Sequence, residues 1–348
     1  MHSIASGPIP IVARPFEIKA EPIEIRWDAS MPVFAKEDFL RAVGDEYGWL
    51  GGIGGSGNLR CILPYTIVRK SGLRMVRFRM ETIASGDEKL SIDEERSFLN
   101  NVVHYFKRMR VDAIIPPTNN ALFRTYPDGA HAAPYGSYVI DLQLSEEVLW
   151  RNVSKTTRSN IRTAQKDGVS IREGIEFLQP AYELIRETFR RSKMSFMDGE
   201  SFKRFVLSLG ENGKILMAEF QGVAQSYSVF AFSDPCAYWI YGGNIQGQHQ
   251  GAMKFLQWEA IRLFRNLGVK KFDFFGARIN PEKGSKQEGI NLMKKNLGAT
   301  LAEGYVWKYS LRPSRAWLYS IGVRVLRGGD IVDQEAHKLK EYVAKAKS

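Results

Sequence analysis

Alternating apolar and polar positions are clearest in the stretch 236–298. An aromatic, alternating run at 236–241 predicts a buried strand, and apolar residues at helical spacing predict a helix over 256–267. The run 269–275 predicts a second strand, and a short helix follows. A strand, a glycine loop and a helix leave unpaired N–H groups at the helix start, which attract phosphate or carboxylate. We therefore predict that this stretch forms the floor of an active site.

The same patterns predict the rest of the second half. Strands are expected at 169–172, 214–220, 223–232 and 305–311, and helices at 178–191 and 201–209. Short turns join the strands at 214–241, so we expect them to form an antiparallel meander. The predicted order is strand, two helices, three-stranded meander, helix, strand, helix and strand.

The first half predicts a mixed α+β pattern without regular βαβ alternation. Strands are expected at 23–27, 60–68, 73–80, 111–115 and 138–142, and helices at 36–43 and 92–110. Residues 1–22 carry four prolines and predict an extended arm. The glycine-dense run 48–58 predicts a hairpin or flexible loop; a phosphate-cradling loop is the alternative, although no Lys-Ser or Lys-Thr directly follows it.

Four cations share one face of a helix expected between Ser145 and Gly168. They stand at i, i+3, i+7 and i+11, and they are Lys155, Arg158, Arg162 and Lys166. Like charges on one stripe repel each other unless an anion lies among them. The stripe predicts a helix that faces phosphate or nucleic acid, with a solvated helix face as the alternative.

Charge and composition narrow the function classes. The chain has 348 residues, 44% hydrophobic and 25% charged, with a net charge of +11, which favours an anionic partner such as nucleic acid, anionic lipid or a phosphorylated substrate. Two cysteines and five scattered histidines predict no disulfide framework and no metal site. Because no apolar run is long enough to span a membrane and no signal peptide is recognisable, we expect a cytoplasmic protein.

The segment 312–348 predicts a basic amphipathic helical tail. Trp317, Leu318, Ile321, Val325 and Leu326 form an apolar stripe beside several arginines. Two uses fit this pattern: packing on the body of the protein, or lying on an anionic membrane surface.

Three segments in order resemble the Fem (FemABX-like) family of peptidoglycan-bridge aminoacyltransferases. The first is the basic helix KTTRSNIRTAQKDGV at 155–169. The second is YWIYG at 238–242 with the following helix, and the third is FDFFG at 272–276 leading to MKKNLG at 293–298. In the last run the family has F-K-x-G-F-G. The resemblance covers about residues 135–311 and extends more loosely to the first half.

The resemblance implies a mixed α+β fold of two N-acetyltransferase (GNAT)-like lobes packed around a cleft. The order of elements in the second half is also that of such a lobe. We therefore expect an arm at 1–22, a diverged first lobe at 23–144, a second lobe at 145–311 and the tail at 312–348.

The resemblance also implies transfer of an activated aminoacyl or acyl group to an amine. In the family the donor is aminoacyl-tRNA and the acceptor is a cell-wall precursor. Aligned with the family's lysine motif, Lys294 is the candidate to stabilise the oxyanion, with Lys295 as its competitor. Tyr241 and Asp273 are expected at the reacting groups, although a core tyrosine and a carboxylate that braces the Gly276 loop are the alternatives.

The expected substrate-binding residues are Lys155, Arg158, Arg162, Tyr238, Gln248, Gly251 and Lys295. Gln248 and Gly251 are similar to part of the acetyltransferase pyrophosphate loop, so an acyl-CoA donor acting on an amino sugar or surface-polymer precursor is a second hypothesis. A non-catalytic anion-binding module of the same fold is a third. No bound cofactor is expected; tRNA or CoA would arrive as the carrier of the donor, and the tail would be the contact to a membrane surface.

Overall fold

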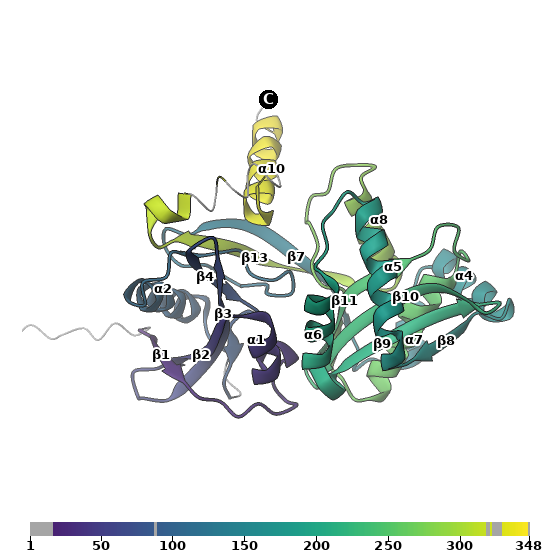
Figure 1. Cartoon of the computed structure of the whole chain (residues 1–348), viewed down its shortest axis with the longest axis horizontal. Coiled ribbons are helices and arrows are strands. Elements are labelled where there is room, and N and C mark those ends of the chain that lie inside the picture. Colours follow the sequence, from purple (N-terminus) through teal and green to yellow (C-terminus); the bar gives the residue numbers. More distant parts are fainter. Residues whose placement is uncertain (1–16, 87–88, 318–320, 322–328, 347–348) are drawn as a thin grey trace, which may run out of the picture.

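The computed structural model describes residues 17–86, 89–317, 321 and 329–346. It has two lobes that lie side by side, with strands inside each lobe and helices on the outside (Figure 1). Among these residues the strands form one continuous sheet in the order β1-β2-β3-β4-β6-β13-β7-β12-β11-β10-β9-β8, with β5 paired to β3. The mixed α+β class predicted from the sequence is confirmed.

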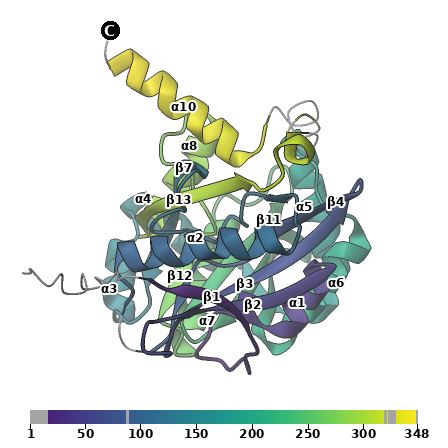
Figure 2. The same cartoon turned by 90° about the vertical axis from the view of Figure 1, so that its left-hand side faces the viewer.

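The first lobe is built on a mostly antiparallel sheet covered by one long helix. Its elements are β1 (Lys19–Ile23), α1 (Glu37–Val43), β2 (Glu46–Ile53), β3 (Leu59–Lys70), β4 (Leu73–Phe78), β5 (Ile83–Ala84), α2 (Ile92–Arg108) and β6 (Ala113–Ile114). Ser91 and Glu94 form a reciprocal capping box that fixes the start of α2. Helix α2 lies across the sheet (Figure 2) and buries Phe98 and Phe106 against it.

The second lobe follows the order that its sequence predicts. Its elements are α3 (Glu146–Asn152), α4 (Lys155–Lys166), β8 (Ser170–Glu173), α5 (Leu178–Arg191), α6 (Gly199–Leu209), β9 (Gly213–Phe220), β10 (Val223–Ser233), β11 (Cys236–Asn244), α7 (Ala252–Asn266), β12 (Lys271–Asp273) and α8 (Lys286–Asn296). Strands β9, β10 and β11 form the predicted antiparallel meander, and β12 lies parallel to β11 after the α7 crossover. Helix α7 supplies much of the core through Leu256, Ile261 and Phe264.

Two long strands belong to both lobes. β7 (His131–Asp141) and β13 (Thr300–Ser310) pair antiparallel from Thr300↔Val139 to Lys308↔His131. One end of β7 pairs with β12, and the far end of β13 pairs with β6, so Trp307 of β13 is buried in the core of the first lobe. The last strand of the chain therefore completes the first lobe.

The lobes also meet through an apolar junction. Phe34 and Met80 of the first lobe pack with Leu209, Tyr238 and Ile240 of the second lobe in one buried cluster. The side chain of Phe34 lies 4.9 Å from the Tyr238 ring, centroid to centroid. This junction holds the lobes together in the way that a hydrophobic core does, because its residues are closed to solvent.

Two local expectations were wrong, and a third was confirmed. Residues 19–22 are not an extended arm: they begin β1, which pairs with β2, while 24–27 lie outside any strand. The hairpin expected over the glycine run is present, because β2 ends in a turn and pairs antiparallel with β3. Gly52 is required in β2 because a Cβ would lie 2.3 Å from the Cys61 Sγ. The helix expected from Ser145 is two helices, since the chain turns out of helix at Val153 and Ser154 caps α4.

Most of the predicted apolar stripe of the tail falls on 318–320 and 322–328, outside the described residues. Helix α10 (Ile331–Ala346) follows and projects away from the lobes at its far end (Figure 1). Its first turns pack on β7 and β13, with Val332 buried and Lys308 paired to Asp330 (2.8 Å) and Asp333 (2.6 Å). Within the described residues, no helix has both the length and the apolarity to cross a membrane.

Candidate functional site

The loop after β12 has an unusual backbone. Phe275 and Gly276 both have positive φ, +59° and +83°. A bulky residue rarely adopts this conformation, so surrounding contacts must hold it. Gly276 has no alternative, because a Cβ would lie 3.0 Å from both the Asn119 backbone oxygen and the Tyr135 hydroxyl.

Asp273 fixes this loop through hydrogen bonds. Its Oδ1 accepts from the Ser137 hydroxyl (2.5 Å) and from the Phe275 N–H (2.6 Å), and the Ser137 oxygen accepts from the Gly276 N–H (3.0 Å). Burial raises the pKa of the Asp273 carboxyl, although these hydrogen bonds oppose the shift. The bracing role left open by the sequence is therefore present in the structure.

Lys294 points inward from α8 to the same loop. Its side chain is 4% exposed, and Nζ donates to the Gly276 carbonyl at 2.5 Å. Burial lowers the pKa of Lys294 to about 8, and the charge of Asp273 opposes the shift. Lys295, one residue along, is exposed. The two lysines thus lie on different faces of α8, and the pattern of two solvated lysines does not occur.

The first lobe contributes a carboxylate that the sequence analysis missed. Glu81 follows β4, and its buried Oε2 has no hydrogen-bond partner in the structure. Burial raises the pKa of Glu81 to about 7, and the charge of Asp273 adds to the shift. The two carboxylates come from opposite lobes, so no spacing in the sequence links them; only the junction of the lobes brings them together.

Both candidate tyrosines of β11 lie among aromatic rings. Tyr238 is buried at the junction of the lobes, with its hydroxyl 3.8 Å from the Met80 Sδ. Tyr241 contacts the rings of Phe196 and Phe202, and burial raises the pKa of its hydroxyl to about 12. Tyr241 is half-buried, whereas Tyr238 is closed to solvent in this structure.

The cationic stripe of α4 lines a pocket of about 450 Å³. Its lining residues are Lys155, Arg158, Ser159, Arg162, Thr163 and Lys166. Arg158 also ties down the end of α3, because its Nη1 donates to the carbonyls of Val153 (2.7 Å) and Arg151 (2.8 Å). The Arg162 guanidinium lies 5.5 Å from the centre of the Trp150 ring. The predicted stripe exists, and Arg158 has a structural duty besides.

The α4 pocket and Lys294 lie on adjoining helices. The Ser154 N–H at the start of α4 donates to the Asn296 carbonyl at the end of α8 (2.9 Å). Lys294 nevertheless donates to the Gly276 carbonyl and does not line the α4 pocket. The buried lysine and the cationic stripe therefore do not share one cavity.

Gly251 has a packing role at the start of α7. A Cβ there would lie 2.2 Å from the Asn160 backbone oxygen and 2.8 Å from the Ala164 Cβ, so α4 crosses directly over this helix end. Nearby, the Nε2 of His249 lies 2.9 Å from the Asp167 Oδ2. The resemblance to a pyrophosphate loop thus coincides with a close contact between two helices.

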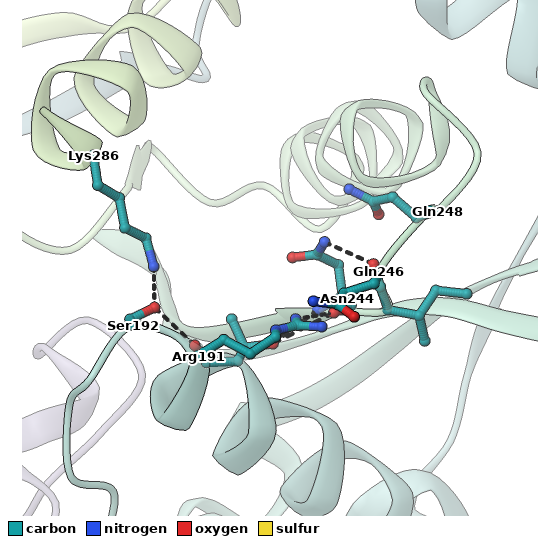
Figure 3. Close-up of a pocket in the computed structure, with 9 residues that line it drawn as sticks. Arg191, Ser192, Asn244, Gln246, Gln248 and Lys286 are labelled. Carbon is teal, nitrogen blue, oxygen red and sulfur yellow. Dashed lines mark hydrogen bonds between the residues drawn. The ribbon is translucent and has the colours of Figure 1, made fainter. Parts of the chain in front are cut away.

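A second pocket, of about 560 Å³, lies between α5, the end of β11 and the start of α8; we call it the α5–α8 pocket. Gln248 lines it, together with Arg191, Ser192, Asn244 and Lys286, and Figure 3 shows these side chains around the opening. Within the described residues, no group of histidine, cysteine or acidic side chains has the arrangement of a metal site.

Comparison with known proteins relates one segment of the chain to a family and the fold to solved structures. Residues 128–226, from β7 to the start of β10, match the model of the FemAB family. FemX has a similar structure, with a TM-score of 0.61 and 14% identity, over 81% of this chain and 92% of FemX. A comparison with curated proteins found no match.

Two further structures are similar. The C-terminal domain of a putative lysylphosphatidylglycerol synthetase from Agrobacterium fabrum has a TM-score of 0.51 at 11% identity, over 83% of this chain and 92% of that one. A tandem GNAT protein from the clavulanic acid biosynthesis pathway has a TM-score of 0.47 at 13% identity, over 79% of this chain and 86% of that one. The similarity to FemX and the order of elements in the second lobe show that the chain has the GNAT-like fold predicted from its sequence, and one segment of it, residues 128–226, matches the FemAB family.

Proposed function

We propose that this protein is an aminoacyltransferase that moves an activated aminoacyl group from aminoacyl-tRNA to an amine of a cell-wall precursor. The match to the FemAB family and the fold shared with FemX support the transferase class. The observation that carries the proposal is a buried ammonium, Lys294, beside the buried carboxylate of Asp273, on a helix whose end meets a cationic helix.

The reaction needs a group that stabilises negative charge. When the acceptor amine attacks the ester carbon, the carbonyl oxygen becomes an oxyanion. A fixed donor in a site of low dielectric stabilises such an oxyanion by about 3–4 kcal/mol. Lys294 meets this requirement, because the Gly276 carbonyl and burial hold its ammonium in place before the substrate arrives. We assign it the oxyanion, with the bond to the tRNA ribose oxygen breaking as the amide forms.

The reaction also needs an acceptor for the proton of the attacking amine. Glu81 is suited to this step, because a carboxylate with a pKa of about 7 is about half ionised at neutral pH and basic enough to take a proton. Its Oε2 has no hydrogen-bond partner that would compete for the proton. Asp273 then acts as the residue that positions the Gly276 loop.

The donor is recognised through its phosphates. Lys155, Arg162 and Lys166 line the α4 pocket, and none of the three forms an ion pair within the described residues. A row of cations on a helix face suits the backbone of a nucleic acid. The α4 pocket adjoins the end of α8, so a bound tRNA would place its acylated end near the loop that Lys294 contacts.

An acyl-CoA donor is the second candidate. The strands β11 and β12 pair at Ala237↔Phe272 and Tyr238↔Asp273, and β11 then continues to Asn244 paired with β10 on its other side. Such divergence leaves an edge where an extended chain can pair. The Asn160 carbonyl, however, packs closely against Gly251, the residue that precedes α7. A pyrophosphate would need open N–H groups at this helix start. This contact favours tRNA over CoA.

The two donors are separated by incubating the protein with aminoacyl-tRNA or acyl-CoA and a panel of amine acceptors. Release of deacylated tRNA with formation of an amide supports the proposal. Release of free thiol from acyl-CoA, with no transfer from aminoacyl-tRNA, would show that the donor is acyl-CoA. No transfer with either donor, with binding of tRNA retained, would leave a non-catalytic anion-binding module.

A further inference from the structure

The α5–α8 pocket is cationic, and none of the proposed catalytic groups lines it. Two cations face it, Arg191 at the end of α5 and Lys286 at the start of α8 (Figure 3). No acidic side chain is among its lining residues. A concave site lined by one sign of charge raises the local concentration of ions of the opposite sign.

Both cations are held by neutral oxygens. Arg191 donates through Nη2 to the Thr188 hydroxyl (2.9 Å) and to the Asn244 carbonyl, and Lys286 donates to the Ser192 hydroxyl. Within the described part of the chain, neither cation has a carboxylate within ion-pair distance. The carboxylate of Glu187 pairs instead with Arg190 at 2.6 Å and acts on Arg191 only at longer range.

The donors of these cations are only partly used. The Nε and Nη1 groups of Arg191 make no hydrogen bond to another described residue, and neither do the remaining ammonium hydrogens of Lys286. A ligand that fits therefore carries an oxyanion, which can accept hydrogen bonds from these unused N–H groups.

We propose that the α5–α8 pocket binds the oxyanion end of the acceptor substrate, a carboxylate or a phosphate attached to a peptide or sugar. This assignment rests on the proposed transferase function. Helix α8 begins with Lys286 in this pocket and carries Lys294 eight residues later, so the two are about 12 Å apart along the helix axis. The acceptor is thus held at its anionic end, and its amine extends toward the Gly276 loop, while the donor occupies the α4 pocket.

Two pairs of probes test the pocket and separate the two sources of oxyanion. Glucosamine 6-phosphate is compared with glucosamine, and trialanine with trialanine amide, each by calorimetric titration of the full chain. Glucosamine lacks the phosphate group, and trialanine amide carries a neutral amide in place of the carboxylate, so each neutral partner lacks the oxyanion. We expect one anionic probe to bind roughly tenfold or more tightly than its neutral partner, because charge-assisted hydrogen bonds to Arg191 and Lys286 are lost with the charge.

In the variants Lys286→Gln and Arg191→Gln, the anionic probe and its neutral partner should bind with nearly equal affinity. Lys286→Gln is the cleaner test of the two, since among the described residues Lys286 donates a hydrogen bond to the Ser192 side chain alone, whereas Arg191 also holds the end of β11. The matched controls are Arg190→Gln, 75% exposed and outside the pocket, and Lys283→Gln, in the loop before α8. Both controls should keep the preference.

The proposal is overturned if neither oxyanion is preferred, or if Lys286→Gln keeps the full preference. It is also overturned if only the Lys155→Gln, Arg162→Gln double variant removes the preference, because the anion would then lie in the α4 pocket. Binding does not depend on turnover. The binding measurements therefore test the assignment of the pocket independently of whether aminoacyl transfer is observed.

Discussion

Lys294 and the α4 face carry the same sign of charge in opposite surroundings. Lys294 is 4% exposed and donates to a fixed backbone carbonyl, whereas Lys155, Arg162 and Lys166 are exposed around an open pocket. A charge removed from water interacts strongly over short distances, and a solvated charge is screened by salt. The comparison assigns chemistry to the buried ammonium and attraction of the donor to the exposed stripe.

Removal of the buried charge should have the largest effect. In Lys294→Met the side chain keeps most of its length and loses its ammonium, so we expect kcat to fall about 10²–10³-fold with donor binding retained. Lys295→Met is the matched control on the neighbouring face of α8. Single-turnover kinetics with both variants measures the difference. Equal losses in the two variants, or full activity of Lys294→Met, would remove Lys294 from the reaction.

The pH dependence of the rate sharpens the same assignment. The pKa of Glu81 is raised to about 7 and that of Lys294 is lowered to about 8. A base that must be ionised and an ammonium that must stay charged produce a bell-shaped profile with limbs near these values. Glu81→Gln should lose the acid limb and Lys294→Met the alkaline limb of the residual rate. A profile whose limbs are unmoved by either substitution contradicts both roles.

The free energy of unfolding should rise with pH, because burial lowers the pKa of Lys294. The pKa of Lys294 in the folded protein lies below its ordinary value of 10.5, so between about pH 8 and 10.5 the unfolded chain binds the proton and the folded chain does not. Wild type should therefore gain stability relative to Lys294→Met as pH rises through this window, by on the order of 3 kcal/mol. Chemical denaturation across the window measures the gain, and a constant difference would show that Lys294 is solvated.

The exposed stripe depends on how α4 is seated on α7. In Gly251→Ala the new Cβ would lie 2.2 Å from the Asn160 backbone oxygen, so the helices must separate, and we expect a loss of about 1–3 kcal/mol in the free energy of unfolding. Gly289→Ala is the control, because Gly289 lies in α8 with open space around it; that change should be neutral or stabilising by up to about 1 kcal/mol. Similar results for both would mean that the helix contact is loose.

Periodicity alone predicted most of the elements, because the helices and the meander follow local apolar spacing. It could not predict that β1 begins at Lys19 or that Gly52 lies within a strand, since pairing with a distant partner decides both. The lysine motif predicted Lys294 as a candidate. Its inward direction and its contact with Gly276 depend on tertiary packing, and so does the meeting of Glu81 with Asp273 across the two lobes.

The smallest effects should separate two arginines that the sequence placed on one stripe. Arg158 donates to the carbonyls at the end of α3, so Arg158→Gln should cost about 1–2 kcal/mol in the free energy of unfolding. Arg162 makes no hydrogen bond or ion pair within the described residues and lies over the Trp150 ring, so Arg162→Gln should change stability by less than about 0.5 kcal/mol.

Arg162→Gln should instead act on the donor. The plot of log affinity for tRNA against log salt concentration should lose roughly 0.7–0.9 of its slope, the amount that one phosphate contact contributes. Titrations of tRNA at several salt concentrations measure this slope, and urea denaturation measures stability in the same two variants. An unaltered slope for Arg162→Gln would mean that the stripe is an ordinary solvated helix face. The proposed role of the buried Lys294 would remain in that case, because its action on the oxyanion does not depend on long-range attraction of the donor.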